Sequence, residues 1–174
     1  MKRWFLGIDP GLSGALAWYD PTYDELDVKD MPTHTVKSNG KQRRKIDFRL
    51  LAAYVDNSRT FTQKALIEEV NAMPGQGVTS MFSFGKAAGA VEMAVAYSAI
   101  PYDMVTPVKW KKAMRVTGQK DEARRAASRL MPKHAHLWAR VKDDGRAEAA
   151  LIAYYLAQQN TGTHAPKLNL SEMM

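Results

Sequence analysis

Short apolar runs alternate with helical periodicities along the chain. Apolar runs bounded by turn residues predict strands over 4–9, 14–19, 26–31, 65–67 and 102–105. Helical spacing predicts helices over 46–55, 81–100, 108–115, 121–130 and 147–158. Thr106-Pro107 supplies a helix start, with a capping side chain followed by proline. Strands early and helices late indicate an α/β domain whose sheet opens as an antiparallel meander and continues with parallel strands.

Two segments lack any apolar periodicity. The stretch 34–45 is polar and basic and is predicted to be a mobile loop. Residues 160–174 form a polar tail, so we expect a single domain over 1–159 followed by a flexible end. No run approaches the roughly 18 apolar residues of a membrane span, and the first apolar run is too short for a signal peptide. These features favour a soluble, intracellular protein.

Charge and composition narrow the classes of partner. The 174 residues include 25 Lys and Arg against 18 Asp and Glu, a net charge of +7. Such a balance favours a polyanionic partner, either nucleic acid or an anionic membrane surface. Cysteine is absent, which excludes a disulfide framework, thiol chemistry and a zinc ribbon.

Acidic residues stand at the ends of two apolar strands. Asp9 precedes Pro10-Gly11, and this strand-end position suits either a catalytic carboxylate or a simple turn cap. Glu68 and Glu69 follow the run 65–67, and only one of them can share a face with a given neighbour because side chains alternate along a strand. A polar strand exit is the structural alternative for this pair.

A third acidic site opens the last predicted helix. Asp144 is able to cap that helix, and Glu148 lies about one turn further in. A carboxylate beside such apolar sequence needs a positive partner, which is either Arg146 or a metal ion.

Together the three sites predict a metal centre. Carboxylate oxygens suit Mg²⁺ or Mn²⁺ better than zinc, and the four histidines are too scattered to contribute. Two such ions, about 3.5–4 Å apart, would activate water and stabilise the leaving oxygen in phosphodiester hydrolysis.

Four segments in the same order resemble one family. They are 7–11 (GIDPG), 66–70 (LIEEV), 105–109 (VTPVK) and 144–149 (DGRAEA), and the likeness runs over about residues 3–158. Together they resemble the RuvC-like Holliday junction resolvases of the RNase H-like (retroviral integrase) superfamily. Actin-like ATPases and sugar kinases also open with a strand ending in Asp-x-Gly, but this chain is much too short for their two lobes.

The resemblance implies a homodimeric endonuclease that uses two Mg²⁺ ions, with Mn²⁺ as a substitute, to cut paired strands of a four-way DNA junction. It implies that Asp9 bridges both metals, that Glu68 and Glu148 are ligands, and that Glu69 is a neighbour. The helix 81–100, rich in Met and Ala, is the expected dimer surface, and core packing is its alternative use. Gly85 and Gly89, one turn apart on it, suit close packing against another backbone.

Two departures from the family pattern concern the site. Resolvases usually place their last two acids three residues apart, but Gly145 stands at that offset, so the role passes to Asp144 or its neighbour Asp143. An aromatic wedge usually follows the second acid, and here Met73 or the later Phe82 would take its place. The compact chain and this loop look more like the phage-encoded branch.

Basic residues supply the expected DNA surface. Nine lie between 109 and 133, against two acids. Phosphate contacts are expected from Lys109, Lys111, Lys112, Arg115, Lys120, Arg124 and Arg125. Lys120 also resembles the family's lysine near the scissile phosphate, where it would stabilise developing charge. Arg43 and Arg44 belong to a second basic stretch that is either a DNA-contacting arm or a plain loop.

We therefore expect a metal-dependent resolvase in the cytoplasm of a bacterium or a phage-infected cell. Two alternatives stay open: a broader nuclease for flaps, forks and replication intermediates, and a non-catalytic architectural DNA-binding protein.

Overall fold

A computed structural model describes residues 2–38, 40–69, 71, 75, 77–117, 119 and 121–162. Its centre is a five-stranded sheet of order β3-β2-β1-β6-β7. The antiparallel meander consists of β1 (Trp4–Asp9), β2 (Ala15–Asp20) and β3 (Glu25–Asp30). Strand β6 (Thr62–Glu68) pairs in parallel with β1, and β7 (Tyr102–Val105) in parallel with β6. The mixed sheet predicted from the sequence is confirmed.

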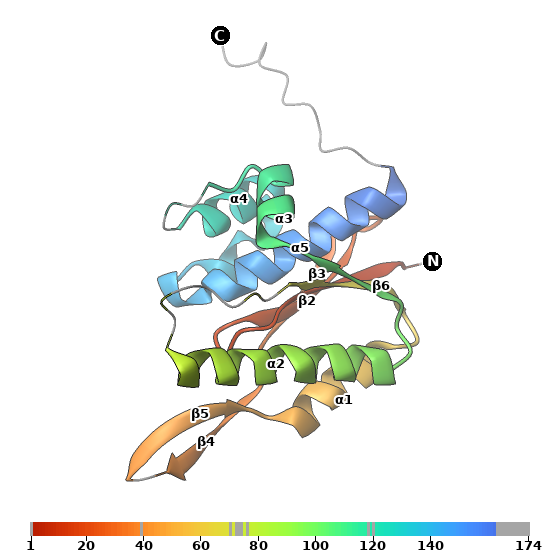
Figure 1. The fold of residues 1–174 in the computed structure, drawn as a ribbon. Coiled ribbons are helices and arrows are strands. Elements are labelled where there is room, and N and C mark those ends of the chain that lie inside the picture. The colour runs from red at the N-terminus through yellow and green to blue at the C-terminus, as the bar shows by residue number, and fades with distance from the viewer. Residues whose placement is uncertain are drawn as a thin grey trace.

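Helices cover both faces of the sheet (Figure 1). On one face lie α1 (Phe48–Ser58) and α2 (Val78–Tyr97). On the other lies α5 (Asp144–Thr161), with α3 (Pro107–Ala113) and α4 (Glu122–Leu130) outside it. Two short 3-10 helices, η1 (Pro132–Trp138) and η2 (Val141–Asp143), lead into α5. Each face of the sheet therefore has its own hydrophobic core.

Helix α5 packs unusually close to β1. A Cβ atom at Gly7 would lie 2.2 Å from the backbone nitrogen of Ala153 and 2.4 Å from the carbonyl oxygen of Ala149. The absence of a side chain on Gly7 and the small alanines of α5 allow the two backbones to touch. This contact fixes the start of α5 beside the end of β1, where two of the predicted acids lie.

The basic stretch 34–45 is not a loop, and this prediction was wrong. Its residues form an antiparallel hairpin of β4 (Thr33–Ser38) and β5 (Lys41–Ile46). Both faces of the hairpin carry polar side chains, so the alternation that marks a half-buried strand is missing. Ile46, only 4% exposed, anchors its base in the core. The following helix begins at Phe48, because Asp47 caps it by accepting the N–H groups of Arg49 and Leu50 at 3.1 and 3.0 Å.

The last helix is longer than predicted at both ends. It begins at Asp144 and ends at Thr161, two residues into the expected tail, most of which lies outside the described residues. Asp144 does not cap the helix, contrary to prediction: Asp143 holds the cap position and makes no capping hydrogen bond. Within the described ranges, no helix is both long and apolar enough to cross a membrane.

Candidate metal centre

Three carboxylates from distant parts of the chain meet at one edge of the sheet. Asp9, Glu68 and Glu148 each offer an oxygen, and these oxygens all lie within 4.8 Å of one another. Asp9 and Glu68 end the adjacent parallel strands β1 and β6, just beyond the Ile8–Ile67 pair. The carboxyl ends of parallel strands meet at the same sheet edge, and α5 adds Glu148 there, one turn after its start at Asp144. The predicted convergence of these three residues is found.

Trp110 orients the second acid. Its indole Nε1 donates to Glu68 Oε1 at 2.8 Å, and the Trp110 side chain is fully buried. Sequence reasoning missed this residue, although its place in the helix that follows Thr106-Pro107 offered a signal. Glu69 stands outside the acidic cluster, as expected from strand alternation.

Lys111 is the positive partner of the third acid. Its Nζ lies 2.7 Å from Glu148 Oε1. The alternative partner considered from the sequence, Arg146, instead forms a two-point ion pair with Asp30 on β3, at 2.5 and 2.6 Å. Lys111 therefore faces the acids rather than open solvent, and only 33% of its side chain is exposed.

The burial of these side chains and the closeness of their charges shift the pKa values of Asp9, Glu68 and Lys111. Burial, with the charges of Glu148 and Glu68, raises the pKa of Asp9 to about 7. Burial also raises the pKa of Glu68, and the hydrogen bond from Trp110 partly offsets this. Burial disfavours the charged Lys111, but its bond to Glu148 and the other acids outweigh burial and raise its pKa. The cluster thus holds more negative charge than one lysine balances, as a cation site does.

The two candidates for the fourth acid have different surroundings. Both oxygens of Asp143 accept hydrogen bonds from Arg140, at 2.8 Å from Nη2 and 2.9 Å from Nε, and this contact holds the pKa of Asp143 below its ordinary value. Asp144 Oδ1 is buried and finds no hydrogen-bond partner among the described residues. Asp144 also lines a cavity of about 410 Å³ with Lys111 and Glu148, although it stands outside the cluster of three. A buried carboxylate oxygen without a described partner, in a cavity that Glu148 also lines, fits a divalent cation.

Comparison with known proteins identifies the fold of this chain. The chain is similar to Thermus thermophilus RuvC, with a TM-score of 0.52 and 19% identity over 91% of this chain and 97% of that one. It is also similar to T. thermophilus RuvC in complex with a Holliday junction substrate, with a TM-score of 0.55 and 17% identity over the same shares. This chain has a RuvC-like fold. Neither a protein-family model nor a curated protein sequence matches it.

Gly145, between Asp144 and Glu148, has no room for a side chain. A Cβ atom at Gly145 would lie 2.2 Å from the carbonyl oxygen of Ser13 and 2.9 Å from Gly14 Cα. The loop after Asp9 occupies the place of a side chain there. Position 145 therefore cannot carry a carboxylate, whereas Asp144 lies one turn before Glu148 on the same side of the helix.

The other residues predicted to bind DNA fall into three groups. Exposed on the surface are Lys109, Lys112, Arg115, Arg125 and Arg43. Bonded within the protein are Arg124, to Asp121 and to the carbonyl oxygen of Ala139, and Arg44, to the carbonyl oxygen of Leu12. Met73 and Lys120 lie outside the described residues. Only 16% of the Arg124 side chain is exposed, and its contact with phosphate stays a prediction.

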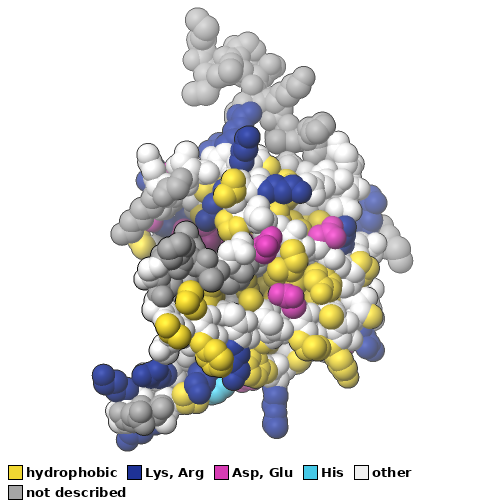
Figure 2. Space-filling view, in the orientation of Figure 1, with side chains coloured by type: hydrophobic (Ala, Val, Ile, Leu, Met, Phe, Trp, Pro, Cys, Tyr) yellow, Lys and Arg dark blue, Asp and Glu magenta, His cyan; other side chains and the backbone are white. Residues whose placement is uncertain are grey.

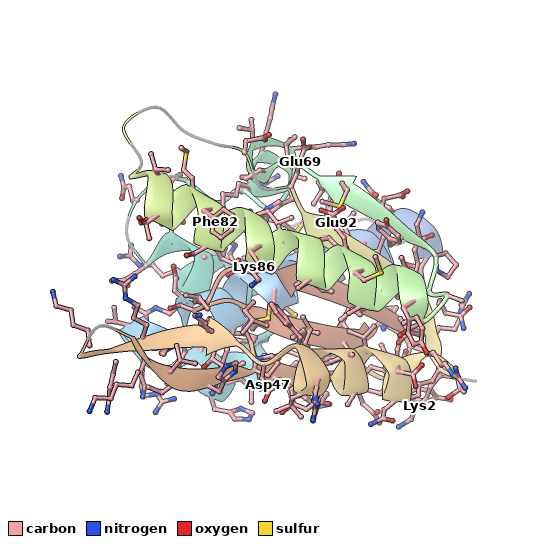
Figure 3. The ribbon with its side chains drawn as sticks, turned by 60° about the horizontal axis from the view of Figure 1, so that its bottom comes forward. Lys2, Asp47, Glu69, Phe82, Lys86 and Glu92 are labelled. Atoms are coloured by element: carbon pink, nitrogen blue, oxygen red, sulfur yellow. The ribbon has the colours of Figure 1, made fainter. Side chains whose placement is uncertain are left out.

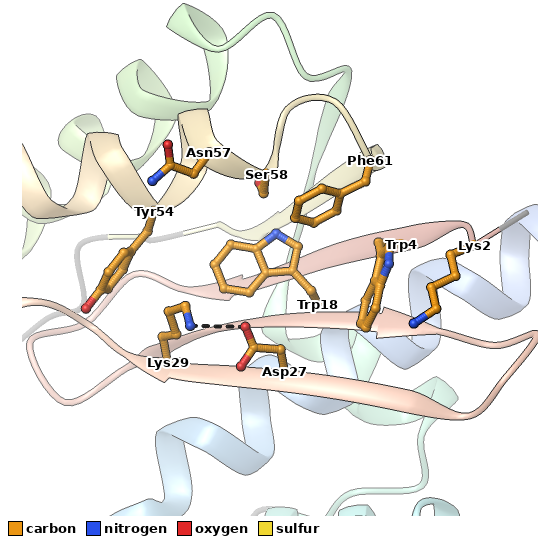
Figure 4. A pocket seen from close by; sticks show the side chains of 9 residues that line it. All are labelled: Lys2, Trp4, Trp18, Asp27, Lys29, Tyr54, Asn57, Ser58 and Phe61. Carbon is orange, nitrogen blue, oxygen red and sulfur yellow. Dashed lines mark ion pairs between the residues drawn. The ribbon is translucent and has the colours of Figure 1, made fainter.

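A larger cavity lies away from the acids. It has a volume of about 540 Å³ and lies between α1 and the strands β1–β3, lined by Trp4, Trp18, Tyr54 and Phe61 (Figure 4). Its two lysines are already paired, Lys2 with Glu25 at 2.5 Å and Lys29 with Asp27 at 3.1 Å. This cavity carries neither the acidic cluster nor uncompensated positive charge.

Proposed function

We propose that this protein is a metal-dependent endonuclease that resolves four-way DNA junctions by paired phosphodiester hydrolysis. The observation that carries the proposal is the cluster of Asp9, Glu68 and Glu148 at the edge of a RuvC-like sheet. A RuvC with this fold was solved with a Holliday junction substrate, which supports branched DNA as the substrate class.

The acids would hold two Mg²⁺ ions, for which Mn²⁺ would substitute. Asp9, Glu68, Glu148 and Asp144 would hold these ions. When bound, such ions supply the positive charge that lowers the pKa of water and stabilises the leaving oxygen of a phosphodiester.

The surrounding residues have separate tasks in this proposal. Trp110 fixes the direction of the Glu68 carboxylate through its indole N–H. Lys111 keeps a positive charge beside the acids, where the scissile phosphate would arrive. Lys120 would stabilise charge that develops on that phosphate, and Met73 would separate bases at the branch point.

Basic side chains around α3 would track the DNA arms. Lys109 and Lys112 are exposed on this helix, while Trp110 and Lys111 between them turn toward the acids. Arg115 and Arg125 extend the exposed set, and Figure 2 shows Lys and Arg gathered above the acidic side chains. Contacts of this kind follow phosphates without reading sequence.

A second copy would pack on the outer face of α2. The inner face of this helix is buried through Ala87, Val91 and Val95, so core packing uses one side. On the outer side Met93 and Tyr97 are 67% and 80% exposed. Gly85 and Gly89 would each accept a Cβ with no atom within 4 Å, so their small size serves no packing within the described chain. A two-fold dimer would match a nearly two-fold substrate.

We place this enzyme in the phage-encoded branch, acting in the cytoplasm of a bacterium or an infected cell.

The test is cleavage of a labelled four-way junction with Mg²⁺, with and without chelator, beside flaps and simple duplexes. We expect paired, Mg²⁺-dependent cuts in the junction. Asp9→Asn should abolish cleavage and keep junction binding, while Asp27→Asn, an exposed acid on β3, should cut like the wild type. Equal rates on all substrates would favour the broader nuclease. Binding without any cleavage would favour an architectural protein, and undiminished cutting by Asp9→Asn would refute the site.

A further inference from the structure

The aromatic cavity between α1 and the strands β1–β3 is a second candidate site. Its walls are the rings of Trp4, Trp18, Tyr54 and Phe61 (Figure 4). Trp18 packs into the core on the α1 side of the sheet, whereas α5, which carries Glu148, covers the other side. The volume of about 540 Å³ falls within the range of sites that take small organic molecules. The cavity is therefore separate from the acidic cluster and large enough for a ligand of its own.

The cavity also lies apart from the surfaces proposed for DNA and for a second copy. Figure 3 shows Lys2, on its rim, beside the end of α1 and apart from Phe82 and Lys86 in the first turns of α2. None of its described lining residues belongs to α2, to α3 or to the β4–β5 hairpin. A molecule bound in the cavity would leave those surfaces free.

The charges on the rim are balanced within the protein. Both lysines that line the cavity, Lys2 and Lys29, are paired with acids of β3. Their ammonium groups also lie 5.8 and 5.7 Å from the ring centres of Trp4 and Tyr54. A cationic ligand would meet like charge at these rings, and an anionic ligand would find no unpaired cation among the described lining residues. The cavity therefore suits a neutral molecule.

One polar group in the wall lacks a partner. Trp18 Nε1 is buried and has no hydrogen-bond acceptor among the described residues. The other two buried tryptophans do have acceptors, which are Glu68 for Trp110 and Ser128 for Trp138. Buried indole N–H groups usually find a partner. An acceptor atom on a bound molecule would complete the hydrogen bonding of Trp18.

The remaining wall offers both hydrogen-bonding roles and flat surfaces. Figure 4 shows the indole nitrogen of Trp18 turned toward Ser58 and Phe61. Asn57 is exposed on the rim, and its amide is able both to donate and to accept. Aromatic rings in a wall favour a flat ligand that stacks on them or meets their edges. The complementary molecule is flat and neutral, and its edge carries a carbonyl oxygen and an N–H, as a lactam ring does.

We propose that this cavity binds a free, neutral, bicyclic heteroaromatic lactam, the chemical class that includes the nucleoside inosine. Its ring would pack among Trp4, Tyr54 and Phe61, and its carbonyl oxygen would accept from Trp18 Nε1. The same kind of ring occurs in the bases of DNA, but the described lining offers no unpaired cation for the adjoining phosphates. The free molecule is therefore favoured. The inference goes beyond the proposed nuclease and does not rest on it.

Titration with inosine, in chelator and without DNA, tests the site. A nitrogen–hydrogen correlation spectrum reports the indole N–H of each of the four tryptophans, which are assigned by replacing each in turn with phenylalanine. Inosine should move the Trp18 signal downfield, because its N–H gains an acceptor, and should move the Trp4 signal through ring stacking. The signals of Trp110 and Trp138, which lie in the core on the α5 side, should stay in place.

Variants of the walls test the aromatic contacts. Phe61→Ala and Tyr54→Ala should each weaken inosine binding about tenfold. Phe48→Ala is the matched control, because Phe48 is 46% exposed against 42% for Phe61 and does not line the cavity. It should bind inosine as the wild type does.

A change in the ligand tests the hydrogen bond to Trp18. Purine riboside lacks the carbonyl oxygen of inosine, and it should bind the wild type about fivefold more weakly. Trp18→Phe removes the N–H and should bind the two nucleosides equally. The comparison of the two nucleosides on the wild type stands even if Trp18→Phe does not fold.

The outcomes that would overturn the site are distinct from failure of the nuclease. They are a stationary Trp18 signal in millimolar inosine, equal shifts of all four indole signals, and wild-type affinity in both Phe61→Ala and Tyr54→Ala. Equal binding of inosine and purine riboside to the wild type would likewise overturn it. None of these measurements involves cleavage, so a protein that cuts no DNA would refute the proposed function and leave the cavity as a ligand site.

A single-stranded oligonucleotide that carries one deoxyinosine distinguishes the two sources of the ring. We expect it to move the Trp18 signal at no lower concentration than inosine does. A shift of the Trp18 signal at a lower concentration would assign the cavity to a base of DNA and overturn the free molecule as its ligand.

Discussion

Asp9 is a carboxyl group that the metal-free protein keeps partly protonated near pH 7. Its neighbours Glu68 and Glu148 repel its negative charge, and burial removes the water that would solvate it. A divalent ion reverses both effects, so ion and proton compete for the same oxygens. The strength of metal binding should therefore increase as the pH rises through 7.

The stability of the metal-free protein should show the opposite trend. In the unfolded chain Asp9 ionises near a pKa of about 3.9, whereas the folded protein keeps it protonated up to about 7. The contribution of neutral Asp9 to the free energy of unfolding is therefore fully present below about pH 4. It is lost as the pH rises through 7, and the total decrease is up to about 4 kcal/mol.

Urea unfolding in chelator between pH 4.5 and 8 measures this effect. We expect Asp9→Asn to remove most of the decrease, because asparagine does not titrate, and the difference between the two proteins cancels the titration of other groups. Parallel curves for wild type and variant would contradict the raised pKa.

Gly145 should tolerate no side chain. Gly145→Ala would drive a methyl group into the carbonyl oxygen of Ser13 and displace the loop that follows Asp9. We expect a loss of about 1–3 kcal/mol in urea unfolding, with a matching loss of cleavage. Gly77→Ala is the control, because a Cβ atom there meets open space and its φ of −64° suits alanine. If Gly145→Ala is as stable as the wild type, the close contact between Gly145 and the loop after Asp9 is refuted.

The sequence was sufficient to predict Asp9, Glu68 and Glu148, because each ends or opens an apolar element and strand ends converge. It left Asp143 and Asp144 undecided, since that choice depends on which of them Arg140 binds. For a related reason the sequence left the contacts of Trp110 and Lys111 with the acids undecided, although both follow Thr106-Pro107 and Lys111 was predicted to contact phosphate. Neighbours on a short helix can face the site or the solvent, and only the packing of α3 against the sheet determines which.

At the scale of elements, α2 has two apolar sides and the sheet uses one of them. Met93→Glu would place a charge in the middle of the outer side, 67% exposed in one chain. If the proposed dimer forms through this side, light scattering should report the mass of two chains for the wild type and of one chain for this variant. Tyr23→Glu, a comparable change in the β2–β3 turn, where Tyr23 is 53% exposed, should stay dimeric. If Met93→Glu is still dimeric, the interface lies elsewhere on the protein.

Elements with an apolar pattern were predictable to within a few residues, and the hairpin was not. Strands β4 and β5 bury little besides Ile46. Their pairing comes from backbone hydrogen bonds and the turn at Gly40, which has a φ of 74°. Backbone hydrogen bonds and a turn do not alter the pattern of hydrophobic residues from which strands are predicted.

For the whole molecule, the net charge of +7 divides into separate regions. Basic side chains lie on α3 and on the hairpin, while the acids of the cluster lie at the sheet edge. Affinity for a four-way junction should decrease steeply with salt. Lys109→Ala, Lys112→Ala and Arg115→Ala together should reduce the slope of log affinity against log salt by about 3.

Fluorescence anisotropy at several salt concentrations measures that slope. Arg59→Ala is the control, since Arg59 lies at the end of α1 and pairs with Asp56 at 3.3 Å. An unchanged slope in the triple variant would show that α3 does not contact the DNA.

The contact of α5 with β1 also sets the order in which the acidic cluster can assemble. Asp9 and Glu148 are far apart in the chain, and β1 cannot acquire its helical partner before the segment that carries Glu148 has been synthesised. Long-range contacts of this kind form late in folding. A nascent or truncated chain that lacks α5 therefore carries an incomplete set of acids and no closed core. The fold keeps the cluster unassembled until α5 has been made.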